Sequence, residues 1–368
     1  MDNKMSVPST LSLCMIVRDE EKVLERCLQS VYDLVDEIII VDTGSTDRTK
    51  QIAKKFTDSL YHFQWIDDFA AARNYSFAQS TKDYILWLDA DDVLLEPDRL
   101  AFQELRTLLD GTIDRVTMPY HLTTDLNGNV GYSLRRNRIV RRNAGFQWFG
   151  RVHEYLEVSG NAIDSDVAIT HKSEKSPSSR NLMIYRTMQK NHEPFTPRDT
   201  LYFANELMYN GQKEDAIIEF EKFLSSQRGW KEDNIIACLN IANCYKGRDE
   251  KKRLSSLFQT FEYDLPRAEA CIEIGQYFIE QEELEKAIYW LELIFSTKKP
   301  ETLGMLNQSA WTWAPLIQLT YCYDRIGQSE KAYEKHKQAK ALVPDHPSVL
   351  LNEAYFLSHL EKNSYQFD

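Results

Sequence analysis

The stretch Tyr84-Ile-Leu-Trp-Leu-Asp-Ala-Asp-Asp92 is an apolar run that ends in three carboxylates. The run has the length and composition of a buried strand, and the abrupt change to acidic residues marks the end of that strand. Three anions at the end of a hydrophobic strand repel one another, so they need a cation or a set of hydrogen-bond donors to neutralise them. We therefore expect a divalent metal ion at this position.

Asp89 and Asp91 are the candidate metal ligands, because they flank one small residue, Ala90, and can reach the same side of a strand-to-loop transition. Hard oxygen ligands of this kind suit Mg²⁺ or Mn²⁺, whose coordination is usually completed by substrate phosphates and water. Such an ion would hold a diphosphate leaving group. Asp-x-Asp alone is a weak motif, and the alternative is a solvent-facing strand end with helix-capping aspartates.

Length, charge and cysteine content narrow the class of protein. A chain of 368 residues favours two domains, and a net charge of -12 argues against a nucleic-acid partner. The six cysteines form no CxxC pair and lie mostly in apolar segments, so we expect them to be reduced. The first ten residues lack the apolar core of a signal peptide, and no apolar stretch has the length of a membrane span. We expect a cytoplasmic protein.

Strand and helix patterns alternate in the first half of the chain. Strand-like runs lie at 11–17, 37–41, 60–63 and 84–88, with helical patterns at 23–31, 48–56 and 65–74. This alternation predicts a parallel sheet with covered faces, and ligands of such sheets bind outside the carboxyl ends of the strands.

Three strand ends should therefore share one rim. They are Arg18-Asp19-Glu20, Asp42-Thr43-Gly44-Ser45 and Asp89-Ala90-Asp91. A carboxylate such as Asp42 can accept hydrogen bonds from a base or a sugar. The segment after Asp42 also fits the start of a helix, with Gly44 in the turn and Ser45 or Thr46 as N-cap, and both interpretations can hold at once.

Arginines form a second group of candidates. Arg73, in the alanine-rich helical pattern, is a bidentate donor suited to phosphate or carboxylate, although a lone helical arginine is more often solvated. Two further strand-like runs, 116–125 and 131–140, are joined across Asn127-Gly128, a hairpin signal. A basic run follows on the second of them: Arg135, Arg136, Arg138, Arg141 and Arg142. We expect a solvated sheet edge there, or a surface that faces an anionic donor or acceptor.

Two histidines and one glutamate complete the candidate site. His153 and Glu154 lie in an aromatic segment, where a carboxylate can act as a general base near neutral pH. His171 ends a short strand-like run that begins at Asp166.

The second half of the chain is helical. Small residues recur at the offsets of tetratricopeptide helix pairs, for example Ala204 and Ala216, then Gly275 and Ala287, with Ala332 in a later copy. We expect three or four imperfect repeats that form a concave surface for a peptide or a second subunit.

Four motifs taken together resemble the inverting family-2 glycosyltransferases of GT-A fold. They are Leu13-Cys-Met-Ile-Val-Arg-Asp-Glu20, Val41-Asp-Thr-Gly-Ser-Thr-Asp47, Phe69-Ala-Ala-Ala-Arg-Asn74 and Leu88-Asp-Ala-Asp-Asp92. The later Phe149-Gly-Arg-Val-His-Glu154 and the appended repeats are similar to a narrower group, the sublancin-type bacterial peptide glycosyltransferases, which modify cysteine or serine side chains.

The resemblance implies a role for each matching residue. Asp42 would contact the uridine of a UDP-sugar, with Asp19 or Glu20 nearby, and Arg73 would help to hold the donor. Asp91, more than Asp89, would ligate the metal, with His171 as a further ligand. Glu154 would deprotonate the acceptor, with His153 at the same site. The whole expected donor set is Arg18, Asp19, Glu20, Asp42, Gly44, Ser45, Arg73, Asp89, Ala90 and Asp91.

The expected organisation is an α/β GT-A domain at 1–180, a connecting helix and linker at 181–198, and all-α tetratricopeptide-like repeats at 199–368. The expected activity is transfer of a hexose from a UDP-sugar to a cysteine or serine side chain of a peptide bound by the repeats, in a homodimer. Two alternatives remain: a glycan or lipid-linked acceptor with repeats that only dimerise the chain, and a non-catalytic scaffold that works through its repeats.

Overall fold

The computed structural model describes residues 9–125, 128–174 and 179–363, and these residues form two compact units. The first unit comprises residues 9–123, 133–174 and 179–206, and the second comprises residues 124–125, 128–132 and 207–363. The chain thus passes from one unit to the other within helix α6 (Pro197–Tyr209). The domain boundaries expected from the sequence, at 180 and 199, stay a prediction.

A mixed sheet forms the centre of the first unit. Its strands run in the order β3-β2-β1-β4-β7-β6-β11-β5, with β10 also paired to β6. The bounds are β1 (Leu11–Val17), β2 (Glu37–Asp42), β3 (Leu60–His62), β4 (Tyr84–Trp87), β5 (Asp92–Val93), β6 (Arg115–His121), β7 (Tyr132–Arg141), β10 (Ala162–Asp164) and β11 (Ile169–His171). The first four strands are parallel, as expected from the alternating pattern. Strand β7 is antiparallel to both β4 and β6, and its pairing with β6 is the antiparallel arrangement that the hairpin signal between these two runs predicted.

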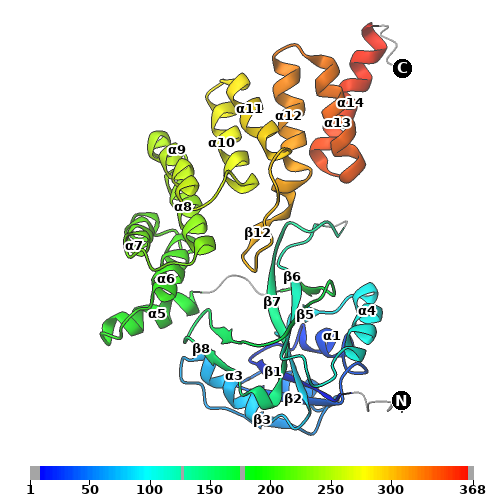
Figure 1. Cartoon of the computed structure of the whole chain (residues 1–368), viewed down its shortest axis with the longest axis vertical. Helices are drawn as coiled ribbons and strands as arrows, with labels where there is room; N and C mark the ends of the chain where they lie inside the picture. Colours follow the sequence, from blue (N-terminus) through cyan, green and yellow to red (C-terminus); the bar gives the residue numbers. More distant parts are fainter. Residues whose placement is uncertain (1–8, 126–127, 175–178, 364–368) are drawn as a thin grey trace. The chain divides into compact units, whose positions relative to one another are not determined.

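Helices cover both faces of this sheet (Figure 1). The bounds of these helices are α1 (Leu24–Gln29), α2 (Thr49–Ala53), α3 (Phe69–Ala78) and α4 (Glu96–Thr107), and helix α5 (Arg180–Lys190) follows the last strand of the sheet along the chain. One core layer joins α1 and α4 to the sheet, for example through Leu28 and Phe102. The other joins α3 to the sheet and to the separate hairpin of β8 (Gln147–Phe149) and β9 (Tyr155–Glu157), through Phe77 and Trp148. This is the α/β GT-A-like arrangement expected from the motifs.

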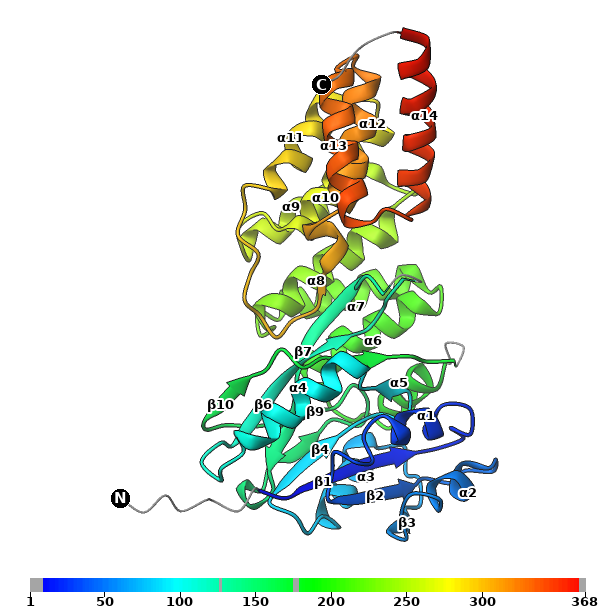
Figure 2. The same ribbon diagram turned by 90° about the vertical axis from the view of Figure 1, so that its right-hand side faces the viewer.

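The basic run lies on an internal strand. Strand β7 is paired on both sides, with β4 and with β6, as Figure 2 also shows. Arg138 is fully buried. The expectation of a solvated edge is therefore wrong, because the arginine face of β7 is covered by aromatic and acidic side chains from elsewhere in the chain. Of the expected hairpin turn, Asn127 lies outside the described residues, while Gly128 has a positive φ of 84°.

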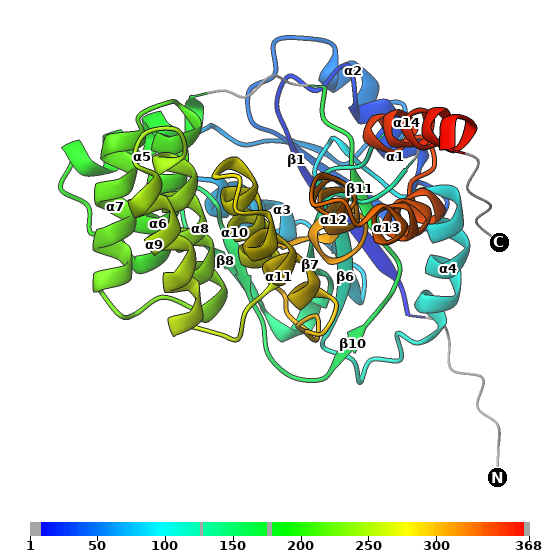
Figure 3. The same cartoon turned by 90° about the horizontal axis from the view of Figure 1, so that it is seen from above.

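Antiparallel helices follow one another in chain order through the second unit (Figures 1 and 3). Their bounds are α7 (Lys213–Ser225), α8 (Lys231–Tyr245), α9 (Glu250–Gln259), α10 (Ala268–Glu280), α11 (Leu284–Ile294), α12 (Ala314–Arg325), α13 (Ser329–Leu342) and α14 (Pro347–Asn363), with a two-residue strand β12 (Leu306–Asn307) before α12. Helices α8 and α9, α10 and α11, and α12 and α13 pack as pairs, and each pair contacts the next, which is the expected repeat architecture.

All six cysteines are buried and unpaired. Burial raises the pKa of the Cys238, Cys271 and Cys322 thiols to about 12. Within the described ranges, no helix combines the length and the apolar character that crossing a bilayer requires.

Helices α10 and α11 approach closely at Gly275. A Cβ added there would lie 2.8 Å from both Cγ and Cδ2 of Leu291, which is fully buried. We predict that Gly275→Ala lowers the free energy of unfolding of the repeats by about 1 kcal/mol. Overpacking against Leu291 costs about 1–3 kcal/mol, and the higher helix propensity of alanine returns roughly 1 kcal/mol of this loss. Denaturant unfolding followed by circular dichroism measures the effect.

Leu291→Ala provides the control, because it removes the atoms that the new methyl group would meet. We expect the double variant to be less destabilised than the sum of the two single variants by about 1 kcal/mol. Strictly additive effects would show that the Gly275 contact is not a packing constraint.

Candidate functional site

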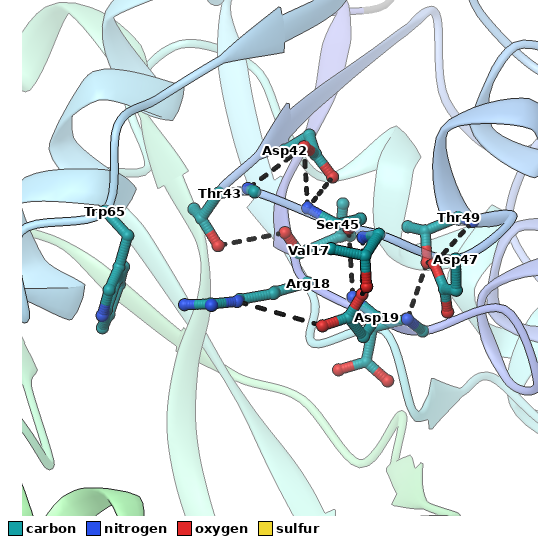
Figure 4. A network of polar contacts seen from close by, with 12 residues as sticks. Val17, Arg18, Asp19, Asp42, Thr43, Ser45, Asp47, Thr49 and Trp65 are labelled. Carbon is teal, nitrogen blue, oxygen red and sulfur yellow. Dashed lines mark hydrogen bonds and ion pairs between the residues drawn. The ribbon is translucent and has the colours of Figure 1, made fainter.

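The loops after β1 and β2 are tied together at the carboxyl end of the sheet (Figure 4). The carboxylate of Asp42 is buried and accepts hydrogen bonds from the backbone N–H groups of Gly44 and Ser45, each at 3.1 Å. Gly44 has a φ of 109°, a conformation that glycine adopts without strain. Asp42 thus shapes the turn that follows β2, with Gly44 in the turn as expected. Helix α2 begins only at Thr49, with Arg48 as its N-cap residue, so the expectation that Ser45 or Thr46 caps this helix is wrong.

Asp19 connects the two loops. Its N–H donates to Oγ of Ser45 at 3.0 Å, and its carboxylate accepts from the N–H of Thr46 at 2.8 Å. The N–H of Glu20 donates to Oγ1 of Thr49 at 2.7 Å. Arg18 extends from the same loop toward Trp65, a residue that the sequence analysis did not single out (Figure 4). The predicted donor residues of β1 and β2 are therefore neighbours, held by a network of backbone and side-chain bonds.

The three carboxylates after β4 have three different environments. Asp92 is fully buried, and its Oδ2 accepts from the N–H of Asp89 at 2.9 Å and pairs with Nη1 of Arg138 at 3.0 Å. Asp89 accepts from Nη2 of Arg73 at 2.6 Å. Asp91 is partly exposed, and its Oδ1 lies 3.4 Å from Nδ1 of His171. Protein cations thus neutralise Asp89 and Asp92, and Asp91 is left facing a histidine at the rim.

Arg73 bridges two acidic side chains that are far apart in the sequence. Its Nε donates to Oε1 of Glu154 at 2.6 Å, while its Nη2 donates to Asp89. The guanidinium lies 4.9 Å from the ring centroids of both Trp87 and Trp148, and only 8% of the side chain is exposed. The solvated helical arginine that the sequence left open is therefore excluded. A direct contact from Arg73 to the donor stays a prediction.

The charges around Asp89 set its protonation state. Burial works to raise the pKa of this carboxyl, but the nearby guanidinium groups of Arg73, Arg138 and Arg136 outweigh it and hold the pKa well below its usual range. Burial also opposes ionisation of Asp91, and its hydrogen bond with His171 lowers the pKa of Asp91 nonetheless. Both carboxylates are ionised at neutral pH.

One group of side chains could hold a metal ion within the described ranges. The donor atoms of Asp91, Asp92 and His171 all lie within 4.8 Å of one another. Oδ1 of Asp92 is buried without a hydrogen-bond partner, and contacts with Asp91 and Asp92 raise the pKa of His171 to about 10. A site that stabilises a proton on His171 and leaves a buried carboxylate oxygen unpaired fits a divalent cation, and carboxylate oxygens suit Mn²⁺ or Mg²⁺.

This group overlaps the expected metal set in two of three members. Asp91 and His171 come together, whereas Asp89 is held by Arg73 and Asp92 takes the third place. Ala90 is buried within the loop that separates the two carboxylates. Asp89 as a metal ligand stays a prediction. The sequence showed three adjacent carboxylates but gave no signal for which of them would be directed inward.

His153 and Glu154 are adjacent in the sequence but have different partners. His153 has a positive φ of 51°, and its Nε2 lies 2.9 Å from Oε1 of Glu206. Its ring stacks on Tyr202 with centroids 4.2 Å apart. These contacts anchor the segment to α6, while Glu154 reaches Arg73. A catalytic role for His153 stays a prediction. In the structure, its contacts with α6 hold the backbone next to Glu154 in place.

Comparison with known proteins identifies the first part of the chain. Residues 12–103 match the model of the family described as Glycosyl transferase family 2. The match covers the strand ends of β1, β2 and β4 and helix α3. The resemblance to family-2 glycosyltransferases that the motifs predicted is confirmed for this part.

Three curated relatives cover different shares of the chain. The TPR repeat-containing protein Synpcc7942_0270 of Synechococcus elongatus is 44% identical over 149 residues, which are 40% of this chain and 36% of that protein. The SPbeta prophage-derived glycosyltransferase SunS of Bacillus subtilis is 27% identical over 73% of this chain and 65% of its own length. The lipopolysaccharide core biosynthesis glycosyltransferase LpsC of Rhizobium meliloti is 27% identical over 41% of this chain and 58% of its own. The chain thus spans less than two thirds of each.

Removal of Arg73 should destabilise the first unit. In Arg73→Met, Glu154 and Asp89 would be left without their counter-charge, and breaking a buried ion pair costs about 3–5 kcal/mol. Because Asp89 is 31% exposed, we expect a loss near the lower end, roughly 3 kcal/mol. The shift of the denaturant midpoint of the first unit measures it.

The double variant Arg73→Met with Glu154→Gln is the matched control, since it also removes the carboxylate charge that the single variant leaves buried without a partner. We expect it to recover part of the lost stability. A double variant that is no more stable than Arg73→Met would show that the Arg73–Glu154 pair is not what holds Arg73 in place.

Proposed function

We propose that the chain, whose residues 12–103 carry a Glycosyl transferase family 2 domain, is a metal-dependent inverting glycosyltransferase that uses a UDP-sugar as donor. One observation carries the proposal. At the carboxyl end of one sheet, a buried arginine links a possible metal site to a carboxylate. The possible metal ligands are Asp91, Asp92 and His171. Arg73 binds both Glu154 and Asp89, and Asp89 lies in the same loop as Asp91 and Asp92.

The donor would lie across the strand ends. The network of Asp19, Asp42, Gly44 and Ser45 supports a nucleoside subsite next to Arg18 and Trp65. Its bonds fix the loop conformation before a ligand arrives, which lowers the entropy lost on binding. Asp91 and His171 would hold the metal ion, with Asp92 behind them. A divalent cation bound there would neutralise the charge that develops on the departing diphosphate.

Glu154 would act as the general base. Arg73 and the two tryptophan rings fix the carboxylate through its Oε1. The acceptor thiol or hydroxyl would transfer its proton to Glu154 as its sulfur or oxygen attacks the anomeric carbon. The bond from that carbon to the donor phosphate breaks, and UDP leaves with the electron pair. A single displacement of this kind inverts the configuration at the anomeric carbon.

The acceptor we propose is a cysteine or serine side chain of a peptide bound by the helical repeats. The similarity to the glycosyltransferase SunS over 73% of the chain supports an enzyme over a scaffold, because it extends beyond the family-2 domain. The peptide acceptor follows from the resemblance of the Phe149–Glu154 motif and the repeats to peptide glycosyltransferases. A glycan acceptor is the second candidate, favoured by the similarity to LpsC, a lipopolysaccharide core biosynthesis glycosyltransferase. The expected homodimer and cytoplasmic location stay predictions.

Loss of the base should abolish transfer without abolishing donor binding. We expect Glu154→Gln to reduce turnover at least about 100-fold, because general-base catalysis contributes roughly 10²–10⁴-fold. Mass spectrometry of a cysteine- and serine-containing peptide after incubation with UDP-glucose and Mn²⁺ measures transfer. Glu157→Gln, an exposed position on the same hairpin, is the matched control and should keep wild-type turnover. Near-normal turnover of Glu154→Gln would refute the base assignment.

Loss of the partly exposed metal ligand Asp91 should abolish metal-dependent donor binding. We expect Asp91→Asn to bind UDP in Mn²⁺ no more tightly than the wild type does without metal, since an amide is a weaker ligand than a carboxylate. Calorimetry with UDP, with and without Mn²⁺, measures this, and Asp58→Asn at an exposed site on the first unit controls for the loss of one charge. A wild-type protein without metal-dependent UDP binding would favour the scaffold alternative instead.

A further inference from the structure

The arginines of β7 and its C-terminal extension are not equivalent. Four of the five have close partners: Arg135 donates to the carbonyl of Ser165 at 2.6 Å, Arg138 pairs with Asp92 at 3.0 Å, Arg141 pairs with Asp114 at 2.5 Å, and Arg142 donates to the carbonyl of Lys82 at 2.5 Å. Within residues 9–125, 128–174 and 179–363, the side chain of Arg136 has neither a hydrogen bond nor an ion pair, while its backbone is part of the ladder with β6. Four of these guanidinium groups therefore have a structural role that Arg136 lacks.

Aromatic rings hold Arg136 in place. Its guanidinium carbon lies 5.7 Å from the ring centroid of Trp87 and 5.3 Å from that of Tyr120. Arg138, two residues along the strand and on the same sheet face, contacts the same two rings at 4.1 and 4.4 Å. Cation–π contacts orient a guanidinium but leave its N–H donors available. Arg136 thus has a defined position and five donors that no protein acceptor uses.

The two neighbouring cations repel each other. Asp92 neutralises Arg138 in a buried pair, and Asp89, whose charge interacts with that of Arg136, makes its short ion pair with Arg73 instead. An anion bound beside Arg136 would relieve this repulsion. The second interpretation of the basic run from its sequence is a surface of β7 that faces an anionic ligand. Of the five arginines in this run, Arg136 is the one that still fits that interpretation.

Arg136 lies beside the candidate metal group. Tyr120, one of its two ring partners, has its hydroxyl 3.0 Å from Nδ1 of His171. Trp87, the other, is followed after one residue by Asp89 and then by Asp91. Antiparallel pairing of β7 with β4 and β6 places its first half, which contains Arg136, toward the carboxyl end of β4. The unpaired guanidinium is therefore at the ligand-binding rim.

We propose that Arg136 is a donor-binding residue whose guanidinium contacts the phosphate that leaves with UDP, on the opposite side of the site from Arg18. This inference rests on the proposed function. A guanidinium matches two phosphate oxygens with parallel N–H donors, and its charge opposes the negative charge that grows on the leaving group. Its aromatic support fixes it before the donor binds.

Calorimetry with three probes tests the proposal in the presence of Mn²⁺: UDP, UMP and uridine. We expect Arg136→Gln to weaken UDP binding about tenfold or more, the loss typical of one charged hydrogen bond, while uridine affinity changes by less than about twofold. Arg136→Lys, which keeps the charge but not the fork, should lose less than Arg136→Gln. An effect on UDP that is larger than the effect on UMP identifies the terminal phosphate as the group contacted.

Arg141→Gln is the matched control, because it removes the same charge from the same strand at a side chain that is 40% exposed. It should bind all three probes as the wild type does. Equal losses of affinity for UDP and uridine in Arg136→Gln would overturn the proposal and show a structural role. Unchanged UDP affinity would overturn it too, and a raised Michaelis constant for an anionic acceptor would then place Arg136 at the acceptor instead. If Arg136→Gln does not fold, Arg136→Lys with unaltered UDP affinity overturns it equally. A wild-type protein that binds no UDP contradicts the proposed function itself.

Discussion

The candidate site depends on one buried guanidinium. Arg73 lies between two tryptophan rings and binds a carboxylate on either side, so the acidic loop after β4 and the segment of Glu154 share a single counter-ion. A buried charge without a partner is costly, and the two bonds at 2.6 Å therefore couple the positions of two segments that pack on different elements. The distance between the proposed metal ligands and the proposed base is set by this side chain.

A second buried pair supports the first. Arg138 and Asp92 are both inaccessible to solvent, and Asp92 also receives the N–H of Asp89. The pair closes the loop from Asp89 to Asp92 from beneath, which directs Asp91 outward. Arginines of the protein thus neutralise two of the three carboxylates, Asp89 and Asp92. The metal ion proposed at Asp91 and His171 would neutralise the third.

The fold could be predicted well where apolar runs are continuous. Strands β1 and β2 match the expected bounds to within one residue, because a strand buried on both faces needs an unbroken apolar run. Strand β7 could not be predicted in its place, since the burial of Arg138 depends on Asp92, a partner distant in sequence. The same limit applies to the site: the motifs located Asp91, His171 and Glu154, but local sequence does not show that Arg73 joins Asp89 to Glu154, or that His153 turns toward Glu206. For the same reason Trp65 was not singled out, Asp92 was not among the expected metal ligands, and Arg136 could not be separated from the other arginines of its run.

The burial of every cysteine has a bearing on self-modification. The proposed acceptor includes thiols, and the chain carries six thiols of its own, each enclosed in a core where burial keeps the sulfur protonated and out of reach of an activated sugar. Under the proposed function, its own cysteines are therefore protected from the transfer reaction. In a reaction mixture with the folded protein, a sugar attached through sulfur would therefore be on the added acceptor. A thiol-alkylating reagent added to the same mixture would measure the free thiols of that acceptor and not those of the protein.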